Sequence, residues 1–311
     1  MGQLTLKVNE ATIKKMKAYY DAYLDQAPQG AIFRARTNQA VVTAYRSGKV
    51  LFQGNNVEAE AGRWNDYQTP ITKGAKAKKA APTTMYRPPE SLFNQDHIGS
   101  DESGTGDYFG PVTTAAVFVT AEQIPILKEL GIQDSKAIND QVVQQLAKQL
   151  AAMHIPYSLM ILHNDKYNRL QAEGWSQGKM KAMLHHATIN RLIQKLNHTN
   201  YDGILIDQFC QPSVYLNYLA SEQEKLQSHT YFMTKAEHYS IAVAAGSVIA
   251  RASFLQEIER LSNKIGFELL KGASNKVDQL IANIIRTKGE DALEEVAKVH
   301  FKNTEKAQQY L

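Results

Sequence analysis

Four acidic residues stand where apolar stretches of the sequence end. Asp101 and Glu102 occur in "HIGSDESGTGDYFGP", Asp207 closes "GILID", and Glu237 follows "TYFMTKA". Because the ends of neighbouring strands in an open α/β sheet converge on one crevice, acids far apart in sequence can meet there. Carboxylates placed together repel one another unless a cation joins them. Oxygen ligands without His or Cys partners suit Mg²⁺ or Mn²⁺ better than Zn²⁺. The sequence therefore predicts a divalent metal site at one end of a sheet.

Each acid also has an ordinary interpretation. The Asp-Glu pair can be a solvated turn, Asp207 a cap at the start of a loop, and Glu237 a residue favoured by the dipole at a helix start. Neighbouring strand residues point to opposite faces, so Asp101 and Glu102 can serve one site only if the strand ends or bends. Three glycines follow within eight residues, and we expect them to supply that bend.

The acids lie in a larger α/β unit that begins near His97. After the glycine turn, four apolar runs are typical of strands: "PVTTAAVFVT", "PYSLMILH", "GILIDQF" and "TYFMTKAE". Helical stretches lie between and after them, including "KMKAMLHHATINRLIQKLN" and "HYSIAVAAGSVIARASFLQEIERL". We expect a mixed sheet flanked by helices over residues 96–311.

Residues 1–80 have the pattern of a smaller α+β module. Their order is strand, helix, three short strands and helix, with the helix after Asn9 carrying apolar residues at helical spacing. In the first of the three strands, alternation puts Phe33 and Ala35 on one face. Ile32, Arg34 and Arg36 occupy the other face, so this module has a basic sheet surface that is free to bind a partner.

Charge is unevenly distributed along the chain. Residues 1–90 hold 14 Lys and Arg against 7 Asp and Glu, whereas residues 91–311 hold 21 against 24. A basic module joined to an acidic one favours a polyanion bound by the first and metal or phosphodiester chemistry in the second. A solvated basic face without a partner is the alternative. The lysine- and proline-rich stretch Thr72–Glu90 cannot form a core, and we place a linker at 81–95.

Composition indicates a globular protein of the cytoplasm. Hydrophobic residues make up 43% of the 311, enough for a core, and the single cysteine, Cys210, excludes an internal disulfide. We find no signal-peptide core in residues 1–29 and no uninterrupted apolar run that is long enough to span a bilayer. Nothing indicates an obligate protein partner or a membrane, and we expect a monomer.

Several linked motifs resemble a known family. "DESGTGDYFGP", "GIQDSK", "ILIDQF" and "AEHYSIAVAAGSVIARASF" are similar, in order and spacing, to the type 2 ribonuclease H family, from Ile98 to "HFKNTEKA". Two features resemble its bacterial ribonuclease HIII branch. Glu237 stands where ribonuclease HII proteins usually have Asp, and residues 1–80 are similar to the TATA-binding-protein-like extension typical of HIII.

The resemblance implies an endoribonuclease with an α/β ribonuclease H-like catalytic domain. Its substrate would be the RNA strand of RNA/DNA hybrids, and its products would carry 5′-phosphate and 3′-hydroxyl ends. It also implies two divalent ions, Mg²⁺ or Mn²⁺, held by Asp101, Glu102, Asp207 and Glu237. The ions would activate a water and stabilise the leaving oxygen, while the acids bind metal and need not transfer protons.

The resemblance also assigns substrate contacts. Gly104, Thr105 and Gly106 would lie against the ribose backbone, where peptide groups can reach the 2′-hydroxyl. HII proteins usually have Arg or Lys in place of Thr105, so a side-chain contact to phosphate is in doubt here, whereas a backbone contact would survive.

Four further residues are substrate-binding candidates by the same resemblance. Ser135 and Lys136 of "DSK" would face a phosphate, although Lys136 can also be a surface lysine. Ser247 and Arg251 share a helix face and would touch the backbone, or the small residues around Ser247 simply let the helix pack closely on the sheet. His300 and Lys302 match the family tail but have no physical role that the sequence defines.

Three alternatives remain open. The chain could incise at single embedded ribonucleotides, as ribonuclease HII does. It could be another nuclease on the same fold, which would cut DNA without any ribose. It could also be a non-catalytic binder of hybrids, although clustered negative charge beside phosphates would not help such a protein.

Overall fold

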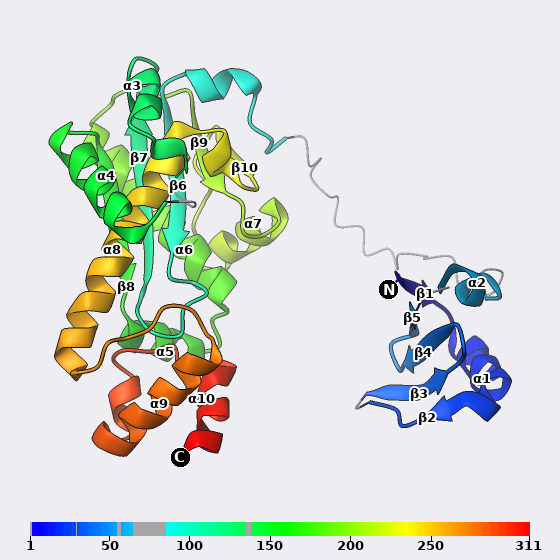
Figure 1. Cartoon of the computed structure of the whole chain (residues 1–311). Helices are drawn as coiled ribbons and strands as arrows, with labels where there is room; N and C mark the ends of the chain where they lie inside the picture. Colours follow the sequence, from blue (N-terminus) through cyan, green and yellow to red (C-terminus); the bar gives the residue numbers. More distant parts are fainter. Residues whose placement is uncertain (1, 29, 55–56, 65–84, 135–137) are drawn as a thin grey trace. The chain divides into compact units, whose positions relative to one another are not determined.

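The computed structural model describes residues 2–28, 30–54, 57–64, 85–134 and 138–311. The chain divides into two compact units, residues 1–79 and 80–311 (Figure 1). The predicted boundary near residue 80 coincides with this division. Each unit has its own sheet and its own apolar core.

In its described residues, the first unit is a five-stranded antiparallel sheet with two helices. Its strands are ordered β1-β5-β4-β3-β2. Its elements are β1 (Gly2–Lys7), α1 (Glu10–Tyr19), the 3₁₀ turn η1 (Asp21–Tyr23), β2 (Leu24–Asp25), β3 (Ala31–Arg36), β4 (Ala40–Tyr45), β5 (Lys49–Gly54) and α2 (Val57–Gly62). The Asn9 side chain caps α1 by accepting from the Thr12 amide at 2.8 Å, as the sequence predicts.

Strand β3 has the two faces that alternation predicts. Phe33 and Ala35 are buried against the helices, and Ile32 and Arg36 are exposed. Arg34 is partly buried. The short edge strand β2 was not predicted, and it brings Asp25 to 3.5 Å from the Arg36 guanidinium. The basic face of β3 is therefore partly neutralised by its neighbour.

The second unit contains a mixed five-stranded sheet ordered β10-β9-β6-β7-β8. The strands β6, β9 and β10 are parallel, while β7 is antiparallel to both β6 and β8. All four strands predicted after the glycine turn are confirmed. The strand bounds are β6 (His97–Ser103), β7 (Val112–Val119), β8 (Tyr157–Leu162), β9 (Gly203–Asp207) and β10 (Thr230–Met233).

Helices cover both faces of this sheet. One face packs against α3, α4 and α8, and the other packs against α6 and α7. A third apolar cluster joins the C-terminal half of α8 to α9, α10 and the stretch after the glycine turn. The helices are α3 (Gln123–Glu129), α4 (Asp140–Ala152), α5 (Asn164–Ala172), α6 (Gln177–Leu196), α7 (Pro212–Ser221), α8 (Ile241–Ile265), α9 (Asn275–Lys288) and α10 (Lys302–Ala307). The 3₁₀ turns are η3 (Glu90–Asn94), η4 (Ile132–Asp134), η5 (Ala236–His238), η6 (Glu290–Leu293) and η7 (Gln308–Tyr310).

Helix α8 is the central core helix of this unit. It lies so close to β6 that a Cβ added to Gly99 would stand 2.1 Å from the Val243 nitrogen. Ala244 and Ala245 are fully buried, as the packing interpretation predicts. Among the described residues, α8 alone is long and apolar enough to cross a membrane, but 78% of its apolar window is buried inside the unit, and Arg251 and Glu257 interrupt its apolar residues.

The predicted linker 81–95 divides into two parts. Residues 81–84 lie outside the described residues. From Tyr86 onward the chain contacts the second unit: the Tyr86 ring lies edge-on to Phe232 at 6.0 Å, and Leu92 is buried against Leu205. Tyr86 and Leu92 therefore attach this segment to the second unit, while residues such as Arg87 and Glu90 stay exposed.

Candidate active site

Two of the predicted acids lie side by side at one edge of the sheet. Strands β6 and β9 pair in parallel up to Ser100 opposite Ile206, so Asp101 and Asp207 are the next residues of each strand. Asp101 is 2% exposed, and its carboxylate accepts a hydrogen bond from the Glu102 amide at 2.8 Å. The register places both carboxylates at the carboxyl end of the parallel strands, where α/β folds bind their ligands.

Glu237 joins the same edge from the turn after β10. Asp207 pairs with Met233 at the end of β10, and its Oδ1 accepts from the Ala236 amide at 3.0 Å. That bond ties the strand end to η5, in which Glu237 is 1% exposed. The turn begins at Lys235, which has a left-handed backbone (φ 57°). Asp101, Asp207 and Glu237 thus share one edge of the sheet, as the sequence predicts.

Glu102 points to the opposite face of the sheet. Strand β6 does not bend between the two acids, because Glu102 pairs with Thr114 and Ser103 with Thr113. The expectation of a bend there was wrong: the glycine turn comes only after Ser103. Period-two alternation therefore separates the two side chains, with Asp101 toward α8 and Glu102 toward α6.

The Glu102 carboxylate is held by two cationic or hydrogen-bonding side chains of α6. Lys181 Nζ lies 2.5 Å from Oε1, and His185 Nε2 lies 2.8 Å from Oε2. Burial by itself raises the pKa of Glu102, but the hydrogen bond and charge of His185, followed by those of Lys181, lower that pKa to about 2. Glu102 is therefore ionised at neutral pH.

The Ser100 hydroxyl and the Phe209 ring contact the α6 side chains that hold Glu102. His185 Nδ1 is 2.7 Å from Ser100 Oγ, and its ring stacks on Phe209 with centroids 5.5 Å apart. Lys181 Nζ lies 4.1 Å above the same Phe209 ring. Residues 177, 181 and 185 are spaced by four, so they follow one stripe of α6. This stripe was not predicted as part of the site, although its spacing is visible in the sequence.

The donor chemistry at the edge fits a hard divalent cation. Asp101, Asp207 and Glu237 offer only carboxylate oxygens, which Mg²⁺ and Mn²⁺ accept more readily than Zn²⁺ does. In the described parts of the chain, no group of three or more His, Cys, Asp or Glu side chains is arranged to hold a metal ion. The carboxylates therefore share an edge and a charge type but do not form a closed cage.

The glycine turn lies directly after β6. Gly104 is buried, Thr105 is partly buried and Gly106 is exposed, with open space where a Cβ would stand. The Thr105 carbonyl accepts a hydrogen bond from the Gln177 side chain at 2.9 Å. The turn therefore presents main chain to solvent beside the acids of β6.

The remaining predicted substrate-binding residues differ in their surroundings. Ser247 is 7% exposed on α8, and Arg251 donates to Asp140 at 2.8 Å, where Lys271 makes a second contact. Ser135 and Lys136 lie outside the described residues. Arg34 and Arg36 belong to the first unit, described above. Arg251 therefore has an acidic partner within the protein.

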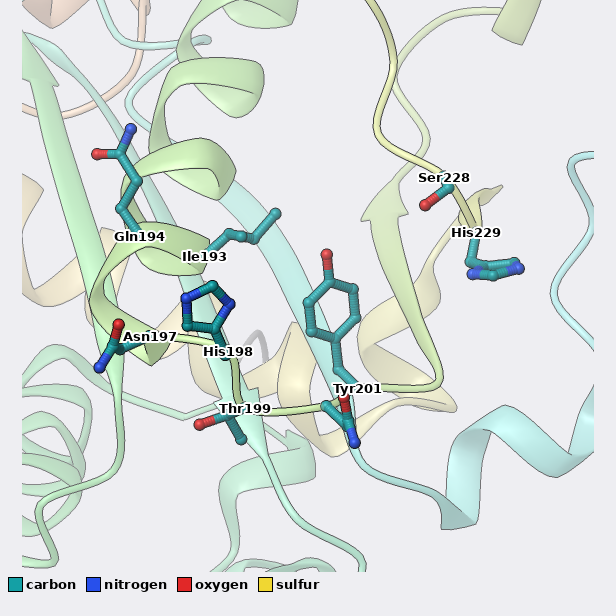
Figure 2. Close-up of a pocket in the computed structure, with 9 residues that line it drawn as sticks. Ile193, Gln194, Asn197, His198, Thr199, Tyr201, Ser228 and His229 are labelled. Carbon is teal, nitrogen blue, oxygen red and sulfur yellow. The ribbon is translucent and has the colours of Figure 1, made fainter.

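A cavity of about 670 Å³ lies at the other end of the sheet (Figure 2). It is lined by residues at the end of α6 and just before β9 and β10, including His198, Tyr201 and His229. None of the four acids lines it. The cavity lies at the amino ends of the parallel strands. It is therefore separate from the carboxylate edge, which is the edge of the sheet that carries Asp101, Asp207 and Glu237.

A mixed sheet covered by helices on both faces, with acids at the carboxyl edge, defines a ribonuclease H-like fold. The chain belongs to the ribonuclease HII family, whose model matches residues 98–304. A second model, a domain of unknown function (DUF3378), matches residues 3–79.

Relatives of full length are named ribonuclease HIII. That of Oceanobacillus iheyensis is 53% identical over 100% of both chains. That of Bacillus licheniformis is 47% identical over 99% of this chain and 98% of its own. The crystal structure of Bst-RNase HIII in complex with Mn²⁺ is 38% identical, covers 99% of this chain and 98% of its own, and has a TM-score of 0.68. Aquifex aeolicus RNase H3, at 22% identity over 95% of this chain and 99% of its own, shares the fold with a TM-score of 0.53.

Proposed function

We propose that this chain is an endoribonuclease that hydrolyses the RNA strand of RNA/DNA hybrids and leaves 5′-phosphate and 3′-hydroxyl ends. The observation that carries the proposal is the carboxylate edge formed by Asp101, Asp207 and Glu237. It occurs in a chain that is 53% identical over its whole length to a ribonuclease HIII. Carboxylates at the carboxyl ends of parallel strands favour metal-dependent hydrolysis over binding alone.

Asp101, Asp207 and Glu237 would hold divalent ions, Mg²⁺ or Mn²⁺, at this edge. Glu102 stays among the proposed metal ligands because it belongs to the "DESGTGDYFGP" motif. Its partners in this structure are Lys181 and His185. When bound, two such ions lower the pKa of a water and neutralise charge on the leaving 3′-oxygen. The chain's own contribution is to orient the carboxylates: the Ala236 amide fixes Asp207, and the Glu102 amide fixes Asp101.

The substrate contacts follow from the same edge. Gly104, Thr105 and Gly106 come directly after the β6 acids, so a ribose beside the metals would meet main-chain groups there. Ser135, Lys136, Ser247 and Arg251 are proposed contacts to the hybrid backbone, and Arg34 and Arg36 are proposed contacts from the first unit.

We place the enzyme in the cytoplasm as a monomer that needs no protein partner.

Replacing one metal ligand tests this function. Asp207→Asn keeps the shape of the strand end and removes one charge, so hydrolysis of a hybrid in Mg²⁺ should fall by at least about a hundredfold while hybrid binding is retained. The matched control is Asp202→Asn, which makes the same change in the exposed residue just before the amino end of β9 and should leave the rate unchanged. A rate for Asp207→Asn within tenfold of the parent would refute the assignment.

A further inference from the structure

Lys298 is a buried amine that the proposed chemistry does not use. Its side chain is 0% exposed, and Nζ donates to the carbonyl oxygens of Asp107 at 2.9 Å and Gly110 at 2.5 Å. Burial lowers the pKa of Lys298 to about 7, against the attraction of Asp107. An apolar side chain would fill this space without the cost of desolvating an amine. What the amine adds is therefore a pair of hydrogen bonds to the glycine turn.

The turn is held from its other flank by Gln177. This residue is at the first turn of α6, and its Nε2 donates to the Thr105 carbonyl at 2.9 Å. The same nitrogen lies 3.1 Å from the Tyr167 hydroxyl. The main chain from Thr105 to Gly110 is thus fixed on one side by α6 and on the other by the C-terminal segment.

Tyr167 connects the two supports. It is fully buried, and its ring centroid is 5.8 Å from Lys298 Nζ. The His300 ring stacks on the Tyr167 ring, with centroids 5.5 Å apart and an interplanar angle of 26°. This contact gives His300 a structural role that the sequence does not define: it packs against the residue between the two supports.

The turn itself is shaped for exposure of its main chain. Gly104 has φ +87°, and a Cβ there would stand 2.3 Å from the Pro111 carbonyl oxygen, so its inner side is filled. A Cβ on Gly106 would meet nothing within 4 Å. The outer side of the turn is therefore open, and its peptide groups are the ones available to a ligand.

We propose that Lys298 and Gln177 are positioning residues that hold the Thr105–Gly110 main chain where it can recognise a ribose 2′-hydroxyl. The inference rests on the proposed function, because it concerns the ribose contact of the same site. A hydrogen bond to a 2′-hydroxyl requires donor and acceptor within about 0.5 Å of their places, and main chain without a fixed position cannot meet that requirement. The two supports therefore contribute selectivity for RNA and not general affinity for phosphates.

The test compares selectivity in the full chain. The dissociation constants for an RNA/DNA hybrid and for a DNA duplex of the same sequence are measured in EDTA for the parent, Lys298→Met and Gln177→Leu. Lys306→Met, an exposed lysine of α10, is the control. Hydrogen exchange of the peptide spanning residues 101–115 is measured beside them.

We expect each of the two variants to bind the hybrid about tenfold more weakly and the DNA duplex within twofold of the parent, since one lost hydrogen bond is worth about one factor of ten. Exchange should rise at 104–110 and stay unchanged in the sheet. Unchanged selectivity in both variants, or equal weakening for both duplexes, would overturn the inference. If Lys298→Met does not fold, Gln177→Leu decides, because its side chain is only partly buried.

The parent separates this inference from the function beneath it. A parent that cuts hybrids in Mg²⁺, with variants that keep its selectivity, refutes only the positioning role. A parent that neither cuts hybrids nor prefers them to DNA refutes the proposed function and the inference with it.

Discussion

At the scale of single residues, the site combines acids whose surroundings differ. Asp101 and Glu237 are almost fully buried at the carboxylate edge, whereas Glu102 lies on the other face with Lys181 and His185. Two adjacent acids of one strand therefore have different partners because alternation sends them to different helices. The sequence names all four residues, but only the pairing of β6 with β7 through Ser103 reveals this separation.

Lys298 gives a prediction for stability against pH. Between pH 7 and about 10.5 the unfolded chain keeps a proton on this amine and the folded chain does not, so its contribution to stability is lost as pH falls through this range and is constant below pH 7. The free energy of unfolding of the parent minus that of Lys298→Met should rise with pH between 7 and 10, by at most about 1.4 kcal/mol per pH unit. Urea denaturation at several pH values measures the difference.

Lys306→Met is the matched control for this measurement, because its exposed amine should give a difference that does not change with pH. A flat difference for Lys298→Met as well would show that the amine titrates alike in both states.

At the scale of elements, the periodic stretches were predictable and the contacts between them were not. The apolar runs predict β7, β8, β9 and β10, and small residues predict the close packing of α8, because strand and helix periods are local properties. Strand β2 was missed because two residues carry no periodicity. The supports of the glycine turn were missed because they are distant in sequence. Gln177 is 72 residues from Thr105, and Lys298 is 191 residues from Asp107.

The glycine turn also sets an expectation for substrate choice. If its main chain contacts several riboses in succession, a run of ribonucleotides paired to DNA should be cut much faster than a single ribonucleotide embedded in duplex DNA. Rates on two duplexes that differ only in the number of ribonucleotides measure this preference. Efficient incision at the single ribonucleotide would instead place the activity with that of ribonuclease HII.

At the scale of the whole molecule, the two units are expected to divide binding from chemistry. The first unit carries Arg34 and Arg36 but none of the four acids, so its removal should raise KM with little change in kcat. The salt dependence of affinity should become shallower by about 0.9 unit of log slope for each lost phosphate contact. The shortened chain is best begun at residue 80, because Tyr86 packs on Phe232 and its carbonyl accepts from the Phe232 amide.

Circular dichroism should first show that the shortened chain is folded. The double variant Arg34→Ala, Arg36→Ala in the full chain supplies the matched comparison, and it should shift KM and the salt slope in the same direction by less. If KM and the salt slope of the shortened chain equal those of the full chain, the first unit does not bind the hybrid.

Product analysis tests the central claim most directly. An RNA/DNA hybrid labelled on each strand in turn is incubated with the full chain in Mg²⁺ and in EDTA, beside a DNA duplex of the same sequence. Hydrolysis at the carboxylate edge predicts cuts in the RNA strand alone, with 5′-phosphate and 3′-hydroxyl ends, only when metal is present. Cleavage of the DNA duplex, cleavage in EDTA, or an intact hybrid in Mg²⁺ would contradict the account.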